Sequence, residues 1–392
     1  MPTHAFADQY WGRQPLLTAH SQLHQDFSDL FSPGAVDELV AERAIRTPFV
    51  RMANKGALLA PSRYTSGGGY GAEISDQLDS EKVLGEFANG STLVLQGLHR
   101  TWPALATFIR QLDADLGCSC QVNAYITPAS ARGFDPHYDV HDVFVIQIHG
   151  EKAWTIHEPV YPDPLPTQPW SDYRAEVAEQ AAGAPYLQQT FAPGDVLYLP
   201  RGWIHSATAL GGTSIHLTIG VSSRTRYDVA RQLLADLAGN PNLRQSLPLG
   251  FGESGPDAER EIVQQTCTAL TDALTADGFV DAFVTRLAGT VPGPARAAPI
   301  RPLATIDALD RLAADTTIAW RPGLGARIVT EGSLVRIELA SKTVALPIEA
   351  TDSLTALHSG VPEKAGRLPG LDAVSSLVVT RRLLREAILV LA

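Results

Sequence analysis

The segment FDPHYDVHDV, residues 134–143, places histidines and aspartates close together at the start of an apolar run. Side chains two residues apart on a β-strand point to the same face, so His137 and Asp139 would share one face. An imidazole and a carboxylate, joined by a distant histidine, form the facial triad that holds non-haem Fe(II). The distant ligand must follow a strand that returns to the same place. His205, which follows the run YLPRGWI, meets this requirement.

Two other histidines are alternatives for the third ligand. His141 lies four residues after His137, on the same strand face but further along, and His216 lies inside the apolar run SIHLTIG. For both, a hydrogen-bonded core histidine is the favoured role. A lone His-x-Asp pair is common and can be a turn with an incidental ion pair. Its place at a strand start, with a second strand ending in PRGWIH, favours a metal site.

Short strands are expected to position these residues. The expected strand segments are 119–128, 142–150, 152–159, 186–209 and 213–223. Gly150-Glu151 separates two of them and predicts a hairpin turn. Many short strands joined by glycine and proline turns predict an all-β sandwich or barrel. In a jelly roll, the Pro-Arg-Gly turn at 200–202 would put His205 at the mouth of the barrel.

The chain is expected to have three parts, because 392 residues exceed one ordinary hydrophobic core. Residues 1–222 form the strand-rich domain with a mixed α/β extension at its N-terminal side. Residues 223–295 carry apolar side chains at helical spacing. Residues 296–392, after a proline-rich linker, combine helices with a small β-ribbon and predict a winged-helix-like domain.

Charge and composition exclude several classes of protein. The net charge of −11 and the pI near 5.4 argue against a general binder of polyanions. Residues 301–392 hold 11 basic and 10 acidic side chains, too balanced for a DNA-reading domain, so no direct DNA binding is expected. No signal peptide and no run of 18 apolar residues are present, so no membrane association is expected. Three cysteines make no disulfide framework, which fits a reducing cytoplasm.

The barrel segments resemble a known family. The runs NAYITP, FDPHYDVHDVFVIQIHGEKAWTIHEP, GDVLYLPRGWIHSA and SIHLTIG, with YWGRQPLL near the N-terminus, are similar to the JmjC ribosomal oxygenases. These are cupin-like protein histidyl and arginyl hydroxylases. The resemblance is dense over the barrel and elsewhere extends only to the arrangement of parts. It implies a double-stranded β-helix of the JmjC/cupin type, a helical dimerisation region that makes a homodimer, and a C-terminal winged helix.

The same resemblance implies Fe(II), 2-oxoglutarate as co-substrate and O2, with His137, Asp139 and His205 as metal ligands. It also implies that Lys152, in the motif G-x-K-x-W, pairs with the distal carboxylate of 2-oxoglutarate. By position alone, Lys152 would be a surface residue in a turn. A dianion in an apolar barrel nevertheless needs a fixed cation, which supports the implied role.

Further co-substrate contacts are implied by position. Asn123 and Tyr125, two residues apart on the preceding strand, match family positions that contact the co-substrate, although ordinary strand polarity would also explain them. Thr218 is a weaker candidate beside His216. The family often has a serine two residues after this threonine, where this chain has Gly220.

The resemblance favours an Fe(II)- and 2-oxoglutarate-dependent dioxygenase that hydroxylates a histidine or arginine side chain of a ribosomal protein or another protein or peptide. One alternative is the same chemistry on a biosynthetic peptide or small molecule. Others are a metal-binding cupin without oxygenase activity, such as an isomerase or sensor, and a transcription factor with a ligand-sensing barrel. Lys152 argues against a non-oxygenase, which has no need of a cation for a diacid.

Overall fold

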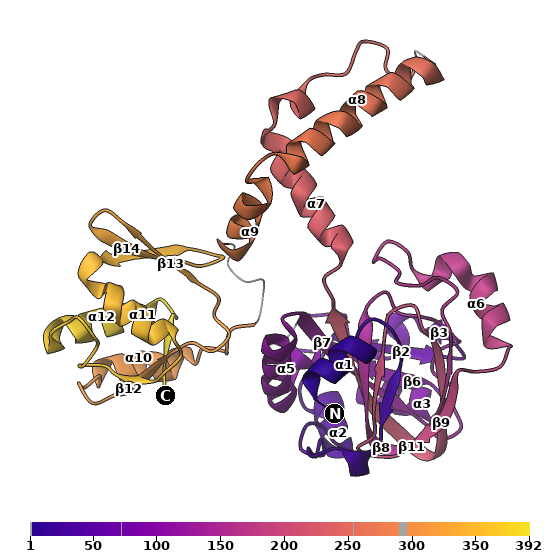
Figure 1. Cartoon of the computed structure of the whole chain (residues 1–392). Helices are drawn as coiled ribbons and strands as arrows, with labels where there is room; N and C mark the ends of the chain where they lie inside the picture. Colours follow the sequence, from indigo (N-terminus) through magenta and orange to yellow (C-terminus); the bar gives the residue numbers. More distant parts are fainter. Residues whose placement is uncertain (1, 72, 254, 290–295) are drawn as a thin grey trace. The chain divides into compact units, whose positions relative to one another are not determined.

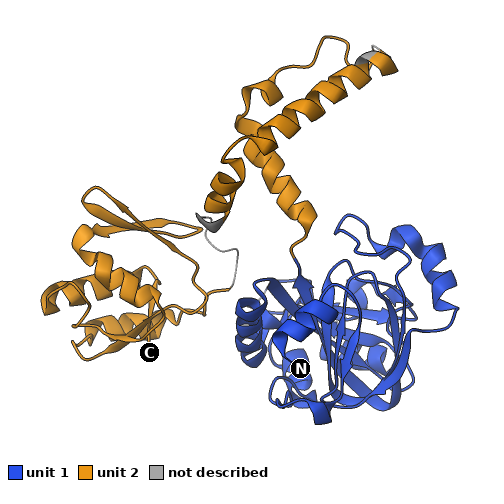
Figure 2. Cartoon of the chain, in the orientation of Figure 1, with its two compact units in different colours: residues 1–223 blue, residues 224–392 orange. Residues whose placement is uncertain are grey.

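The computed structural model describes residues 2–71, 73–253, 255–289 and 296–392. The chain divides into two compact units, Met1–Ser223 and Arg224–Ala392 (Figure 2). Both the predicted helical region and the predicted winged-helix-like part fall in the second unit. The predicted boundary between them adjoins residues 290–295, which lie outside the described residues.

The first unit is built on one large antiparallel sheet with the strand order β1-β10-β8-β11-β7-β6-β2-β3, and β9 pairs with β8. Strands β2, β6, β7, β8 and β11 of this sheet are labelled in Figure 1. The antiparallel pairing agrees with the prediction from the short strands. The strands are β1 (Leu16–Thr18), β2 (Val50–Asn54), β3 (Ala57–Leu58), β6 (Thr92–Leu95), β7 (Ser119–Thr127), β8 (Asp142–His157), β9 (Leu187–Phe191), β10 (Val196–Leu199) and β11 (Ile204–Ser222). A separate pair joins β4 (Thr65–Ser66) to β5 (Gln77–Leu78).

The predicted hairpin at Gly150-Glu151 is wrong, because β8 runs without a break from Asp142 to His157. Gly150 has a φ of 61°, and a Cβ on it would lie 2.3 Å from the carbonyl oxygen of Thr213. The pairing of β8 with β11 shifts register beside this glycine, between Leu210 and His216. Gly150 therefore marks an irregularity in two long paired strands, where the chain continues forward instead of turning back.

Alternation along β7 separates a packed face from a pocket face. Val122, Ala124 and Ile126 are buried in a hydrophobic core that also contains Leu105 and Ile109 of α5 (Pro103–Leu116). Tyr125 and the residues two apart from it point to the other face. The remaining helices of this unit are α1 (Thr3–Gln9), α2 (Pro33–Ala41), α3 (Ser80–Ala88), α4 (Leu98–Thr101) and α6 (Arg174–Ala181).

The second unit begins with three helices, α7 (Arg226–Asp236), α8 (Pro256–Thr275) and α9 (Phe279–Gly289). Its last hundred residues have their own hydrophobic core, centred on side chains such as Val335, Leu354 and Leu383. The elements there are α10 (Pro302–Asp310), β12 (Thr317–Trp320), β13 (Arg327–Glu331), β14 (Leu334–Glu338), β15 (Thr343–Pro347), α11 (Thr351–His358), β16 (Glu363–Lys364), α12 (Ala373–Arg385) and β17 (Leu389–Leu391). They form the sheets β13-β14-β15 and β16-β12-β17.

Within the described part of the chain, no helix is both long and apolar enough to cross a membrane. All three cysteines, Cys118, Cys120 and Cys267, are free thiols.

Candidate active site

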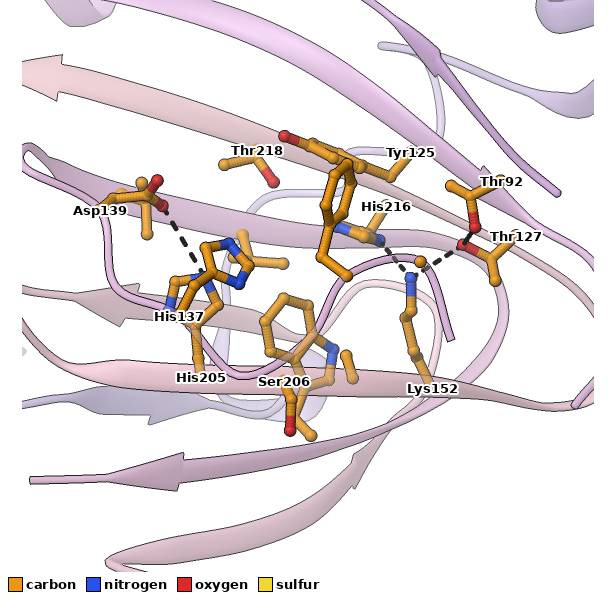
Figure 3. Close-up of a pocket in the computed structure, with 16 residues that line it drawn as sticks. Thr92, Tyr125, Thr127, His137, Asp139, Lys152, His205, Ser206, His216 and Thr218 are labelled. Atoms are coloured by element: carbon orange, nitrogen blue, oxygen red, sulfur yellow. Dashed lines mark hydrogen bonds and ion pairs between the residues drawn. The ribbon is translucent and has the colours of Figure 1, made fainter. Parts of the chain in front are cut away.

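Four neighbouring strands, β6, β7, β8 and β11, line a pocket in the first unit (Figure 3). At one end lie His137 and Asp139, from the segment before β8, and His205, at the start of β11. Toward the other end β8 contributes Lys152. The pocket therefore holds, toward opposite ends, three side chains that could bind a metal ion and one lysine side chain.

Backbone hydrogen bonds hold His137 next to His205. The N–H of His205 donates to the carbonyl oxygen of His137 at 2.8 Å, and the reverse bond measures 3.2 Å. The two rings face each other with centroids 4.5 Å apart. The N–H of Gly202 also donates to the carbonyl oxygen of Asp139 at 3.0 Å. These bonds hold two segments almost seventy residues apart in sequence in one fixed arrangement.

Both imidazoles are oriented by backbone carbonyls. His137 Nδ1 lies 2.7 Å from the carbonyl oxygen of Asp135, and His205 Nδ1 lies 3.1 Å from that of Trp203. A carbonyl oxygen can only accept, so each Nδ1 carries the proton and donates it. Each Nε2 then keeps a free lone pair, as a metal ligand requires. One ligand atom from each of His137, Asp139 and His205 lies within 4.8 Å of the other two.

The charge states of these groups suit a cation. Burial would raise the pKa of Asp139, but the nearby charges of His205, His141, His137 and Arg51 outweigh it and lower that pKa. Burial, followed by the neighbouring His137, lowers the pKa of His205. A neutral imidazole and an ionised carboxylate are the forms that bind metal ions.

Asp142, which the sequence analysis did not single out, anchors the turn that carries His205. Its side chain is fully buried and accepts hydrogen bonds from the Arg201 N–H at 3.0 Å, the Tyr198 hydroxyl at 3.1 Å and the Ser223 hydroxyl at 2.9 Å. The carboxylate thus ties β8 to the β10–β11 turn and to the end of β11. A buried aspartate at the start of an apolar strand was the available signal, because such a charge needs several donors.

Lys152 is 3% exposed and projects into the pocket. Its Nζ donates to Thr127 Oγ1 at 3.1 Å and lies 3.3 Å from His216 Nδ1, and the Thr92 hydroxyl reaches the same Thr127 oxygen at 3.2 Å (Figure 3). None of the described carboxylates forms an ion pair with it. Burial lowers the pKa of Lys152 to about 7. The pocket therefore contains a buried cation whose hydrogen-bond partners are all neutral groups.

The other residues expected at the co-substrate differ in position. Tyr125 and Thr218 line the pocket, and Tyr125 stacks on the ring of His216 with centroids 4.9 Å apart. Asn123 is not among the lining residues; its Oδ1 accepts the N–H of Gly97 at 3.0 Å. His216 is buried beside Lys152, and its pKa is lowered well below the usual range by burial and by that lysine.

The space above Gly220 is taken by His141. A Cβ on Gly220 would lie 2.9 Å from His141 Cε1 and 3.2 Å from His141 Nε2. His141 Nδ1 lies 3.3 Å from the carbonyl oxygen of Asp142. The imidazole of His141, from the segment just before β8, therefore occupies the space that a side chain at position 220 would take.

Three further pocket residues were not anticipated. Thr127 accepts a hydrogen bond from the Lys152 ammonium group, Thr92 donates to Thr127, and Trp154 lies two residues after Lys152 on the same face. The Nε1 of Trp154 is buried without a hydrogen-bond partner among the described residues. Alternation along β7 and β8 would have placed Thr127 and Trp154 on the pocket face, whereas Thr92 depends on the pairing of β6 with β7.

Comparisons with known proteins agree with this architecture. A JmjC domain model matches residues 99–229. Ribosomal oxygenase 1 of Homo sapiens is 27% identical over 261 residues, which cover 64% of this chain and 38% of the human protein. The bifunctional lysine-specific demethylase and histidyl-hydroxylase NO66 of Aedes aegypti is 26% identical over 301 residues, which cover 73% of this chain and 46% of that protein. The chain thus spans less than half the length of these relatives.

Solved structures give the same fold. A crystal structure of ycfD from E. coli has a TM-score of 0.52 at 16% identity and covers 100% of this chain and 98% of that one. A second structure, of YcfD from E. coli described as a ribosomal oxygenase in complex with cobalt and succinic acid, has a TM-score of 0.51. Its identity is also 16%, and it covers the same shares of both chains. The first unit therefore has the JmjC/cupin fold. The chain therefore contains a JmjC domain over residues 99–229 and is similar there and beyond to the ribosomal oxygenases.

Proposed function

We propose that the protein is an Fe(II)- and 2-oxoglutarate-dependent oxygenase that hydroxylates a side chain of a protein or peptide. The observation that carries this proposal is the pairing of two sites in one pocket. His137, Asp139 and His205 meet within 4.8 Å at one end, and the buried Lys152 lies without a carboxylate partner toward the other.

The three residues at the first end fit Fe(II). Two imidazole nitrogens with free lone pairs and one carboxylate are the donor set of the non-haem iron oxygenases, which leave the remaining coordination positions open. When bound, the iron supplies O2 activation coupled to the decarboxylation of 2-oxoglutarate to succinate. The backbone bonds between the His137 and His205 strands keep the donors in place before any metal arrives, which reduces the ordering cost of binding.

Lys152 fits the distal carboxylate of 2-oxoglutarate. A dianion in a poorly solvated pocket needs a fixed cation, and a carboxylate would give the Lys152 ammonium the charged partner that it lacks. Thr127 and Thr218 supply hydroxyls on the same wall, and Tyr125 bounds the space between Lys152 and the metal ligands. The E. coli protein solved with cobalt and succinic acid holds a metal and a diacid, the two ligand classes that we propose here.

The substrate is proposed from the relatives. Their names describe ribosomal oxygenases and a histidyl-hydroxylase, so a histidine or arginine of a ribosomal protein is the first substrate to test. The free thiols fit action in the cytoplasm.

The decisive experiment supplies purified protein with Fe(II), 2-oxoglutarate and air and measures succinate. Mass spectrometry of ribosomal proteins from a deletion strain then asks which residue lacks an added oxygen atom. Succinate formation that stops when a chelator removes the iron supports the proposal. No turnover with freshly loaded iron, in the presence of ribosomal proteins, would refute it.

We further propose three functional parts: a catalytic domain of residues 1–222, a helical dimerisation region of residues 223–295 and a winged-helix-like domain of residues 296–392. Apolar side chains on α7, α8 and α9 support a homodimer, because Tyr227, Leu234, Val263, Val280 and Val284 are each more than half exposed. Monomeric mass in light scattering at micromolar concentration would refute the homodimer.

The assignment of a winged helix is supported by the combination of three helices, α10 to α12, with the antiparallel strands β13 and β14. The near balance of basic and acidic side chains in this domain argues for a structural or protein-binding role, and we expect no salt-dependent DNA binding.

A further inference from the structure

A second cation, Arg51 of β2, lies beside Phe134 of the pocket wall, although it is not itself one of the lining residues. The register aligns Arg51 of β2 with Val94 of β6, and Val94 in turn with Tyr125 of β7. Residues paired in this way share a face, so Arg51 points to the face on which Tyr125 lines the pocket. Its guanidinium carbon lies 5.7 Å from the centroid of the Phe134 ring, another pocket residue.

Phe134 connects this arginine to the metal ligands. Its ring centroid lies 5.9 Å from that of His137 and 6.1 Å from that of Tyr125. The positive charge of Arg51 also contributes to the low pKa of Asp139, after the larger effects of His205, His141 and His137. The guanidinium is therefore close enough to act electrostatically on the proposed metal ligand, although it is too far for an ion pair with it.

Arg51 has unused binding capacity. Its Nε is buried and has no hydrogen-bond partner, and no ion pair joins the side chain to a carboxylate within the part of the chain that the structure describes. By contrast, Arg46, Arg63 and Arg132 on the same unit each pair with an acidic side chain. A guanidinium presents five donors in a planar fork suited to a carboxylate, so an unfilled one beside a pocket marks a place for an anion.

We propose that Arg51 binds a carboxylate of the substrate, so that the substrate of this oxygenase is acidic close to the carbon that reacts. This inference rests on the proposed function and specifies its substrate class. In this proposal Lys152 binds the distal carboxylate of 2-oxoglutarate, and Arg51, near the candidate metal ligands, binds a carboxylate of the substrate. The charge of Arg51 also opposes entry of a cationic arginine side chain, so an arginine target is disfavoured relative to a neutral or acidic one.

The test uses full-length protein loaded with Zn(II), which does not turn over, and saturated with 2-oxoglutarate so that Lys152 is occupied. Calorimetry measures binding of N-acetylglutamate and of the tripeptide amide acetyl-Ala-Glu-Ala-NH2, each beside its glutamine counterpart. The first acid represents a free metabolite and the second an acidic side chain of a peptide. The variants are Arg51→Gln and Arg51→Lys, with Arg43→Gln as the control, because Arg43 is an exposed arginine paired with Glu38.

We expect at least one acid to bind more tightly than its amide, by about ten- to hundredfold, the usual range for a hydrogen-bonded charge pair. Arg51→Gln should abolish that preference, Arg51→Lys should retain part of it, and Arg43→Gln should leave it unchanged. Preference for the tripeptide identifies a peptide substrate, and preference for the free acid identifies a metabolite. Equal binding of acids and amides by the wild type would overturn the assignment.

A second readout separates this inference from the function on which it rests. Affinity for 2-oxoglutarate is measured in the same Zn(II) protein before any acid is added. An Arg51→Gln variant that loses 2-oxoglutarate affinity while Arg43→Gln does not would overturn the substrate role and assign Arg51 to the co-substrate. Absence of 2-oxoglutarate binding in the wild type would instead refute the proposed function.

Discussion

Replacing Lys152 with methionine should weaken co-substrate binding and, at the same time, stabilise the protein without ligand. Methionine keeps most of the length and volume of the lysine stem but removes the charge. Lys152 is 3% exposed, and among the described residues the polar partners of its ammonium group are Thr127 and His216. A buried charge with neutral partners destabilises the folded protein unless a ligand of opposite charge compensates it.

The size of both effects follows from the burial of the ammonium group. The fall in the pKa of Lys152 from 10.5 to about 7 corresponds to roughly 5 kcal/mol, since each pKa unit is worth about 1.4 kcal/mol. Losing the bonds to Thr127 and His216 offsets about 1 kcal/mol each, which leaves a net gain on the order of 3 kcal/mol for Lys152→Met. Removing one partner of a buried charge pair costs about 3–5 kcal/mol, or two to four decades in the affinity for 2-oxoglutarate.

The gain in stability should depend on pH in a definite direction. Below pH 7 both the folded and the unfolded wild type carry the proton on Lys152, so the folded state bears the full penalty. Between about pH 7 and 10.5 only the unfolded chain holds that proton, so the wild type becomes more stable as the pH rises. The advantage of Lys152→Met should therefore be largest at pH 6 to 7 and shrink steadily toward pH 10.

Urea unfolding of the metal-free protein across this pH range measures the stability, and calorimetry with the Zn(II) protein measures 2-oxoglutarate affinity. Lys364→Met is the matched control, because Lys364 is an exposed lysine of the second unit. Lys152→Arg should keep part of the affinity, since a guanidinium also binds carboxylates. If Lys152→Met binds 2-oxoglutarate as the wild type does, or loses stability at every pH, the reasoning about this buried cation is wrong.

Three further predictions test the rest of the site. Alanine at any of the three proposed metal ligands should abolish iron binding and succinate formation. The control variant His141→Ala should keep one iron per chain in metal analysis. Normal iron content in a ligand variant would exclude that residue as a ligand. Asp142→Asn should destabilise the protein by about 1–3 kcal/mol in urea, because three donors lose a charged acceptor; an unchanged midpoint would contradict the anchoring role. Gly150→Ala should weaken 2-oxoglutarate binding more than iron binding, because its methyl group would collide with Thr213 close to Lys152; equal losses of both would argue against this local effect.

Residue types and local spacing were enough to select three side chains that the structure brings together as a candidate metal-binding group. His137 and Asp139 were predicted from alternation on a strand, but both precede β8, which begins at Asp142; His205 was predicted from a turn between strands and begins β11. The partners that orient the imidazoles could not be predicted, because they are the carbonyls of Asp135 and Trp203 and depend on the backbone path through two loops.

Residues whose position depends on pairing between strands distant in sequence could not be predicted. Thr92 lines the pocket, and Arg51 lies on the same face of the sheet, because β2 and β6 extend the sheet beside β7, and no local sequence pattern predicts that pairing. Asn123, by contrast, was expected to face the pocket but is not one of its lining residues. Alternation with Tyr125 predicts that it faces the pocket, but its amide instead accepts the N–H of Gly97 where the chain leaves β6.

The hairpin predicted at Gly150-Glu151 is wrong, yet Lys152 still lines the pocket, and the conformation of Gly150 explains why. A glycine between two apolar runs is the usual signal of a hairpin, and a hairpin would have put Lys152 on a separate strand. In the structure the glycine lets β8 continue, with its positive φ placing backbone against backbone at Thr213. One face of the continued strand carries Lys152, Trp154 and Ile156, and the first two of these line the pocket. The strand that carries Lys152 begins at Asp142, shortly after Asp139, and the irregularity at Gly150 lies between these two positions. A change at this glycine should therefore affect the position of Lys152 more than that of the three candidate metal ligands, two of which precede β8 while the third lies on β11.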